Sequence, residues 1–271
     1  MSIGSNIKAF REERKLTQEQ VAEALGISFQ AVSSWERDEY NPDTDKLIRL
    51  AEVLGVSVSA LVEEKQKFFK TKETIYDWEH MKTYVKTTAR NLKLPNTLKA
   101  VDFAVKAHEG QNRKRSTTPY IYHPLNLACH ALSMDINEDE IIAACLLHDV
   151  VEDCKIGVND LPVNEETKEL VRLLTCEKTN DENRHEIISR YYKEIMTNPK
   201  AALIKCMDRC NNLTTMSWGL SRERIYRMIK ETDEFYPGLL QVIKETTEYN
   251  NAAWLLKYQI ESMLDIYKRL L

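Results

Sequence analysis

Ionisable side chains interrupt an otherwise apolar stretch, residues 146–153, and their types suit metal or proton-transfer chemistry. His148 and Glu152 are four residues apart, so they share a face of the predicted helix, and Asp149 and Asp153 do likewise. Burying charge without compensation costs free energy. This group of side chains is therefore expected to hold a metal ion or a counter-charge.

Two further stretches supply the remaining candidates for a metal centre. In residues 205–212, Asp208 and Asn212 share a face of a predicted helix. In residues 119–124, His123 directly precedes a proline that suits the first turn of a helix. Two imidazoles and two carboxylates suit Mn²⁺, Fe²⁺ or Zn²⁺, with positions left for water. A nearby carboxylate could accept the proton of that water.

Near the N-terminus, residues 17–37 predict two short helices joined by a tight turn. Thr17 is expected to begin the first helix, Gly26 to end it, and Ser28 to begin the second. This geometry lets the second helix enter the major groove of DNA. The candidate DNA-facing residues are Gln18, Phe29, Gln30, Ser33, Ser34 and Arg37. The alternative is a helical bundle that makes only protein contacts.

The elements that must position these residues are predicted to be helices, which makes the protein all-α. Gly and Pro number only 7 each among 271 residues, which is few for an all-β fold. The length suits two domains. We expect a five-helix DNA-binding domain over residues 1–65, a helical linker over 66–95 and a multi-helix catalytic domain over 96–271. The linker is apolar enough to pack on the second domain or on a partner chain.

Composition limits the classes of protein to which the chain can belong. The net charge is −4, so any basic surface must be local. No apolar run of about 18 residues and no signal peptide are visible, so we expect a cytoplasmic protein without a membrane span. The six cysteines form no C-x-x-C pair and are interpreted as reduced thiols. Three histidines, His80, His130 and His185, are interpreted as structural.

The N-terminal segments LTQEQVAEALGIS at residues 16–28 and AVSSWER at 31–37 resemble the Cro/repressor (XRE-type) helix-turn-helix family. The resemblance covers about the first 63 residues. It implies DNA binding through the candidate residues named above. Modules of this kind bind as two-fold dimers, so we expect a homodimer. The apolar residues in 68–85 and 254–266 are either dimer surfaces or core.

Four C-terminal segments resemble the HD superfamily, and within it the hydrolase domain of the (p)ppGpp synthetase/hydrolase (RelA/SpoT) family. They are AHEGQNRK at 107–114, PYIYHP at 119–124, AACLLHDVVED at 143–153 and DRCNN at 208–212. The resemblance covers roughly residues 97–216. It implies hydrolysis of a guanosine nucleotide, with loss of its 3′-pyrophosphate to give GDP or GTP.

The resemblance also implies a role for each matched residue. The implied Mn²⁺ ligands are His123, His148, Asp149 and Asp208. Water would be positioned and activated by Glu152 and Asp153. The implied substrate contacts are Arg113 and Lys114, which would face the phosphates, and Asn212, which would contact the nucleotide.

Two classes of function remain open at this stage. The chain is either a metal-dependent phosphohydrolase joined to a DNA-binding domain, or a transcription regulator whose HD domain binds a nucleotide without turnover. A third option, an intracellular defence or toxin-neutralising factor, rests on the domain architecture alone. Turnover separates the first class from the second.

Overall fold

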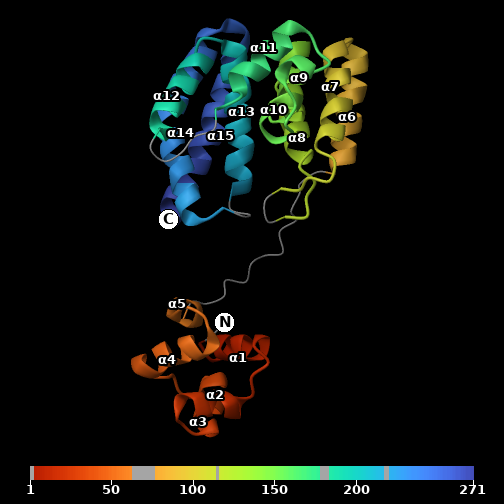
Figure 1. Ribbon diagram of the computed structural model, residues 1–271. Helices are drawn as coiled ribbons and strands as arrows, with labels where there is room; N and C mark the ends of the chain where they lie inside the picture. The colour runs from red at the N-terminus through yellow and green to blue at the C-terminus, as the bar shows by residue number, and fades with distance from the viewer. Residues whose placement is uncertain (1–2, 63–76, 114–115, 178–182, 217–219) are drawn as a thin grey trace. The chain divides into compact units, whose positions relative to one another are not determined.

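The computed structural model describes residues 3–62, 77–113, 116–177, 183–216 and 220–271 (Figure 1). Within these ranges the regular elements are helices, apart from one isolated bridge between Asn112 and Pro119, so the predicted all-α class is confirmed. Contacts divide the chain into two compact units, Met1–Lys72 and Glu73–Leu271. No helix among the described residues is long and apolar enough to cross a membrane.

Five helices form the first unit. They are α1 (Ile3–Glu13), α2 (Gln18–Leu25), α3 (Phe29–Glu36), α4 (Thr44–Leu54) and α5 (Val58–Val62). The predicted caps are confirmed, because Thr17 and Gln20 form a reciprocal capping box and Gly26 adopts the left-handed conformation with φ of 68°. The α2–turn–α3 arrangement therefore follows directly from local sequence signals.

A buried ion pair connects α1 to α3 in the first unit. The Arg11 guanidinium donates to Glu36 through Nε at 2.5 Å, and the Gln18 amide donates to the same carboxylate at 2.8 Å. Burial raises the pKa of Glu36, but the hydrogen bonds from Arg11 and Gln18 outweigh it and hold that pKa below its usual value. Gln18, a candidate DNA contact, thus also has a structural partner.

The second unit is built from ten α-helices and two short 3₁₀ helices among the described residues. They are α6 (Trp78–Leu92), α7 (Pro95–Ala107), α8 (Tyr122–Ser133), α9 (Asp139–Leu147), α10 (Val150–Asp153), η1 (Val158–Asp160), α11 (Glu165–Leu174), α12 (Arg184–Ile195), α13 (Pro199–Thr215), α14 (Arg222–Glu245), η3 (Thr247–Tyr249) and α15 (Asn250–Leu270). Figure 1 shows α6 to α9 on one side of α13, with α12, α14 and α15 on the other.

The core of the second unit surrounds α9. Every residue from Ile141 to Leu147 is buried, and α9 packs against α7, α8 and α11. A helix that is apolar on all sides is stable only when neighbours cover all of its faces. Because α9 lies at the centre of the unit, the residues that directly follow Leu147 also begin in the interior.

Helix α6 packs on the second unit, which is one of the two alternatives expected for the helical linker over residues 66–95. Met81, Val85 and Ala89 of α6 are buried in the core of the second unit. The helix packs on α7 and α8, so it belongs to the same body as the predicted catalytic domain. The rest of the expected linker, residues 66–76, lies outside the described residues.

The C-terminal helix α15 divides its apolar side chains between two faces. Leu256, Ile260 and Leu264 are buried in the core, whereas Trp254 is 65% and Tyr258 71% exposed. The two predicted uses of these residues, core and outer surface, therefore apply to different faces of one helix.

A buried network around Arg209 joins α13 to α12 and α14. The guanidinium donates to Glu231 at 2.6 Å, to the Tyr236 hydroxyl at 2.9 Å and to the Tyr192 hydroxyl at 3.0 Å. The Arg209 side chain is only 7% exposed. Removing one partner of such a pair leaves the other charge buried and uncompensated.

We predict that Arg209→Met lowers the free energy of unfolding by about 3–5 kcal/mol. The matched control is Arg269→Met, which removes an exposed ion pair with Asp265 on α15 and should leave that free energy almost unchanged. Urea unfolding followed by circular dichroism measures both. Equal effects of the two substitutions would contradict the structural role given to the buried network.

Candidate metal centre

Three segments of the second unit bring the four predicted metal ligands together. His123 lies in the first turn of α8, and Asp208 lies in the middle of α13. His148 and Asp149 occupy a break between α9 and α10. The helix predicted within residues 146–153 is interrupted at these two residues. Successive residues of a regular helix point about 100° apart, and the break lets both of these side chains face one centre.

The nitrogen and oxygen atoms of the four ligands converge. His123 Nε2 is 3.2 Å from Asp208 Oδ1 and 3.5 Å from Asp149 Oδ2. His148 Nε2 is 3.2 Å from Asp149 Oδ1 and 3.9 Å from Asp208 Oδ1. One ligand atom from each of His123, His148 and Asp149 lies within 4.8 Å of the others. The four residues therefore surround a common point.

The hydrogen bonds of the two imidazoles leave their Nε2 atoms facing this point. His148 Nδ1 is 2.9 Å from the carbonyl oxygen of Cys145, and His123 Nδ1 contacts the side-chain oxygen of Asn211. His148 Nε2 is buried, and among the described residues it makes no hydrogen bond of regular geometry beyond its contacts with the Asp149 and Asp208 carboxylates. An acceptor at Nδ1 fixes the tautomer that presents the Nε2 lone pair to a metal. The donor set of two imidazoles and two carboxylates thus fits a first-row divalent cation.

The charges of the centre depend on one another. Burial alone would lower the pKa of His148, but Asp149 and Asp208 raise it to about 9. Burial would raise the pKa of both carboxyl groups, yet His148 holds that of Asp149 low, and Lys205 holds that of Asp208 low. Both carboxylates are therefore anionic at neutral pH, which is the form that binds a cation.

A second layer of side chains orients the two carboxylates. The Tyr120 hydroxyl donates to Asp149 Oδ2 at 2.7 Å. The Asn212 amide donates to Asp208 Oδ1 at 2.6 Å, and Lys205 Nζ lies 3.1 Å from Asp208 Oδ2. Sequence reasoning assigned no role to Tyr120, Asn211 or Lys205. The one available signal was Lys205, a charged residue three positions before Asp208 in an apolar run.

The two predicted water-activating carboxylates, Glu152 and Asp153, lie at the border of the centre. Both residues are exposed. Glu152 Oε1 accepts a hydrogen bond from the Cys176 backbone at 2.6 Å. Burial raises the pKa of Tyr120, and the charges of Asp149 and Asp153 raise it further, so the Asp153 carboxylate lies near that hydroxyl. Both acidic groups are open to solvent beside the buried ligands.

The predicted substrate residues are divided between described and undescribed parts of the chain. The Arg113 guanidinium lies 5.7 Å from the centre of the Tyr120 ring and donates to Thr215 at 3.0 Å. Through Tyr120 it adjoins Asp149, and Asn212 contacts Asp208 directly. Lys114 lies outside the described residues. Arg113 and Asn212 are thus both placed next to the metal centre.

The candidate DNA contacts all lie on α2 and α3 or just after them in the first unit. Phe29 and Gln30 are exposed at the beginning of α3, and Phe29 is 45% exposed. Ser33 and Ser34 are half-buried. Arg37 is exposed, donates to the Ser33 hydroxyl and forms an ion pair with Glu39 at 2.8 Å. The exposed start of α3 is the end that a helix-turn-helix inserts into DNA.

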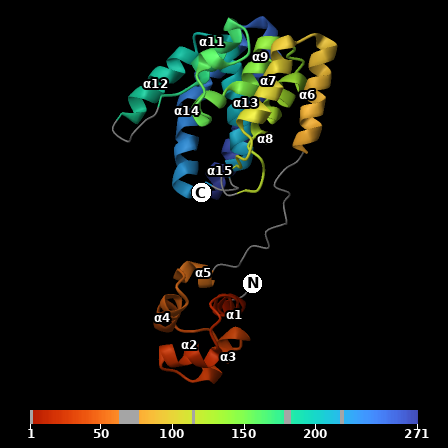
Figure 2. The same ribbon diagram turned by 45° about the vertical axis from the view of Figure 1, so that its right-hand side comes forward.

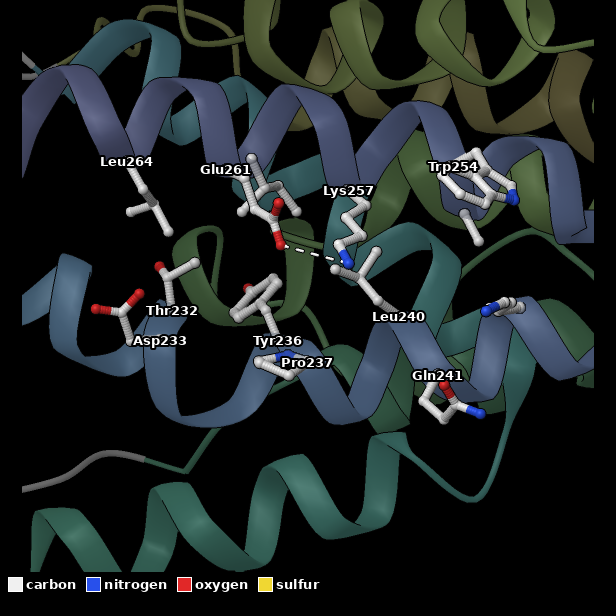
Figure 3. A pocket seen from close by; sticks show the side chains of 13 residues that line it. Thr232, Asp233, Tyr236, Pro237, Leu240, Gln241, Trp254, Lys257, Glu261 and Leu264 are labelled. Atoms are coloured by element: carbon white, nitrogen blue, oxygen red, sulfur yellow. Dashed lines mark ion pairs between the residues drawn. The ribbon is translucent and has the colours of Figure 1, made fainter.

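The second unit also has a groove that is separate from the metal centre. It lies between α14 and α15 and has a volume of about 240 Å³ (Figure 3). Lys257 and Glu261 form an ion pair of 3.7 Å at its side, and Tyr236 and Leu240 line it. None of the predicted site residues lines this groove.

Comparison with known proteins identifies both units. Residues 100–239 match the family model described as the HD domain. This match covers just over half of the chain, so the chain belongs to the HD-domain family. Residues 7–61 match the model described as helix-turn-helix. Both resemblances predicted from the sequence are confirmed.

The second unit is similar both to much longer proteins and to a protein that the alignment covers almost completely. The chain is 31% identical over 173 residues to the probable guanosine-3′,5′-bis(diphosphate) 3′-pyrophosphohydrolase of Synechocystis sp., covering 61% of this chain and 21% of that protein. A solved structure described as a metazoan ortholog of SpoT that hydrolyzes ppGpp aligns with TM-score 0.51 and 22% identity, over 63% of this chain and 94% of that one. The structural likeness shows the shared fold. The chain spans about a fifth of the length of its hydrolase relatives.

The relative of the first unit is a repressor. Over 65 residues the chain is 48% identical to the immunity repressor protein of Bacillus phage phi105. This alignment covers 24% of the chain and 45% of the repressor.

We predict that Asn211→Leu weakens Mn²⁺ binding by about 10- to 100-fold, because His123 loses the acceptor that orients its ring. Asn251→Leu, at an exposed position of α15, is the matched control and should bind Mn²⁺ like wild type. Titration followed by electron paramagnetic resonance of free Mn²⁺ measures both affinities. Unchanged affinity in folded Asn211→Leu protein would argue against His123 as a ligand.

Proposed function

We propose that the second unit is a phosphohydrolase that uses a divalent metal, with Mn²⁺ as the expected ion, to remove the 3′-pyrophosphate of a guanosine nucleotide such as ppGpp or pppGpp. The observation that carries this proposal is the convergence of the imidazoles of His123 and His148 with the carboxylates of Asp149 and Asp208. The names of the hydrolase relatives support the substrate class.

Each residue of the site has a chemical task in this proposal. The metal would be held by His123, His148, Asp149 and Asp208, and when bound it supplies Lewis acidity that activates water and polarises phosphate. The exposed carboxylates of Glu152 and Asp153 accept the proton of the attacking water and return one to the leaving group. Arg113 and Lys114 neutralise phosphate charge, and Asn212 contacts the nucleotide.

Removing one metal ligand should abolish the reaction. We predict that protein with Mn²⁺ releases pyrophosphate from ppGpp or pppGpp, and that Asp149→Ala reduces this rate at least about 100-fold. Removal of the metal with EDTA should have the same effect, and added Mn²⁺ should restore the rate. Asp265→Ala, which changes an exposed carboxylate on α15, is the matched control and should keep wild-type activity.

The opposite outcome also has a defined meaning. If protein shown to contain Mn²⁺ hydrolyses neither nucleotide nor any 3′-phosphorylated nucleotide tested, the hydrolase proposal is wrong. The remaining candidate is then a transcription regulator whose HD domain binds a nucleotide without turnover.

We also propose that the first unit binds a specific DNA sequence, with two copies of the chain forming a two-fold dimer on it. The exposed Phe29 and Gln30 at the start of α3 support this role, as does the likeness to a phage immunity repressor. Gln can read an adenine edge through two hydrogen bonds. Dimeric modules of this type bind half-sites about one helical turn apart.

We predict that selection from random DNA by the wild-type chain enriches a palindrome with half-sites about 10 base pairs apart. Gln30→Ala should lose discrimination at one base pair of each half-site, by about 10-fold or more. Glu52→Ala, an exposed change on α4, should retain the wild-type preference. Enrichment of no sequence by the folded wild-type chain would contradict specific DNA binding.

A further inference from the structure

A large cavity lies in the second unit among α6, α8, α13 and α15, helices that Figure 2 shows in the same unit. Its volume is about 930 Å³, which is within the range of sites that bind small molecules. None of the four metal ligands lines it, and neither do Arg113 or Asn212. The cavity is therefore distinct from the metal centre and from the residues proposed to hold the substrate.

The walls of the cavity combine apolar surface with a few polar groups. Met81, Cys129 and Met263 provide apolar surface, and Tyr84 and Tyr122 provide aromatic rings. Aromatic side chains bind flat rings by stacking. The amide side chains Asn126, Asn211 and Gln259 also line the cavity. Amide side chains can offer a donor and an acceptor side by side, which matches the edge of a purine base.

Two buried polar atoms in the cavity wall make no hydrogen bond of regular geometry. His130 Nε2 and Gln259 Oε1 lack such a bond among the described residues, although the Gln259 side chain interacts with His130 closely enough to oppose the lowering of its pKa, and both residues line the cavity. A buried polar atom without a partner costs free energy that a bound ligand can recover. Burial lowers the pKa of His130 despite an opposing effect of Gln259, so the imidazole is neutral at pH 7.

The charge of the walls restricts the ligand. No Lys or Arg lies among the described residues that line the cavity, whereas Asp77 does. A phosphate group would lack a cation to pair with. This contrasts with the metal centre, where Arg113 adjoins the site. The cavity therefore suits an uncharged molecule.

We propose that this cavity is a second ligand site, which binds an uncharged purine base or nucleoside. The purine lies against the tyrosine rings, and these Gln259 and His130 atoms bond its polar edge. Asn211 adjoins both sites, because it lines the cavity and contacts His123. An occupant would therefore touch the residue that orients one metal ligand.

The test uses the full chain without added metal, and guanosine and adenosine as probes. Saturation-transfer NMR detects binding, and calorimetry measures affinity. We expect at least one nucleoside to bind with a dissociation constant on the order of tens to hundreds of micromolar. Gln259→Leu should weaken this binding about 10-fold or more, because one partner of the purine edge is lost. Ser262→Trp, which fills the cavity from α15, should abolish it.

A matched variant separates this cavity from the proposed substrate site. Asn212→Ala should leave nucleoside affinity unchanged, because Asn212 does not line the cavity. If neither nucleoside binds, the proposal is wrong. It is also wrong if binding survives Gln259→Leu and Ser262→Trp, or is lost in Asn212→Ala. Circular dichroism verifies that each variant is folded. If Ser262→Trp does not fold, the nucleoside affinity of Gln259→Leu is the deciding measurement. Because binding is measured without metal or turnover, failure here is distinguishable from failure of the hydrolase proposal.

Discussion

The structure of the second unit depends on one electrostatic constraint: four ionisable ligands must meet inside an apolar core. Asp149 and Asp208 are too close to each other to be stable as unpaired buried anions. Their charges are balanced by His148 and Lys205, and their oxygen atoms accept hydrogen bonds from Tyr120 and Asn212. A bound divalent cation would replace the His148 proton in this balance. The break between α9 and α10 is the backbone adjustment that lets two consecutive residues reach the centre.

Helix α13 connects the metal centre to the rest of the unit. One face presents Asp208 and Asn212 to the metal centre, and Asn211 contacts His123. Arg209 instead joins α12 and α14 through Glu231 and two tyrosines. A single helix therefore fixes the ligands and holds the two halves of the unit together. Because Asn211 also lines the large cavity, the same helix places that cavity next to the centre.

The sequence predicted the parts of this protein that local signals determine. The all-α class and the caps Thr17 and Gly26 are confirmed. The packing of α6 on the second unit was one of two predicted alternatives, because its apolar face fits a partner chain as well as a core. Tyr120 was missed, since its role depends on a contact with Asp149, 29 residues away, that periodicity does not reveal. Lys205 lies three residues before Asp208 on one helix, so its contact followed from helical spacing but was given no role. The cavity is formed by helices that are distant in sequence, so no local sequence pattern predicts it.

The most direct test of the central claim is anomalous diffraction at the manganese edge from crystals of the chain soaked in Mn²⁺. We predict one strong peak about 2.2 Å from Nε2 of His123, Nε2 of His148 and an oxygen of each of Asp149 and Asp208. A peak at another position, or no peak at this centre in crystals that contain the ion, would contradict the proposed metal centre.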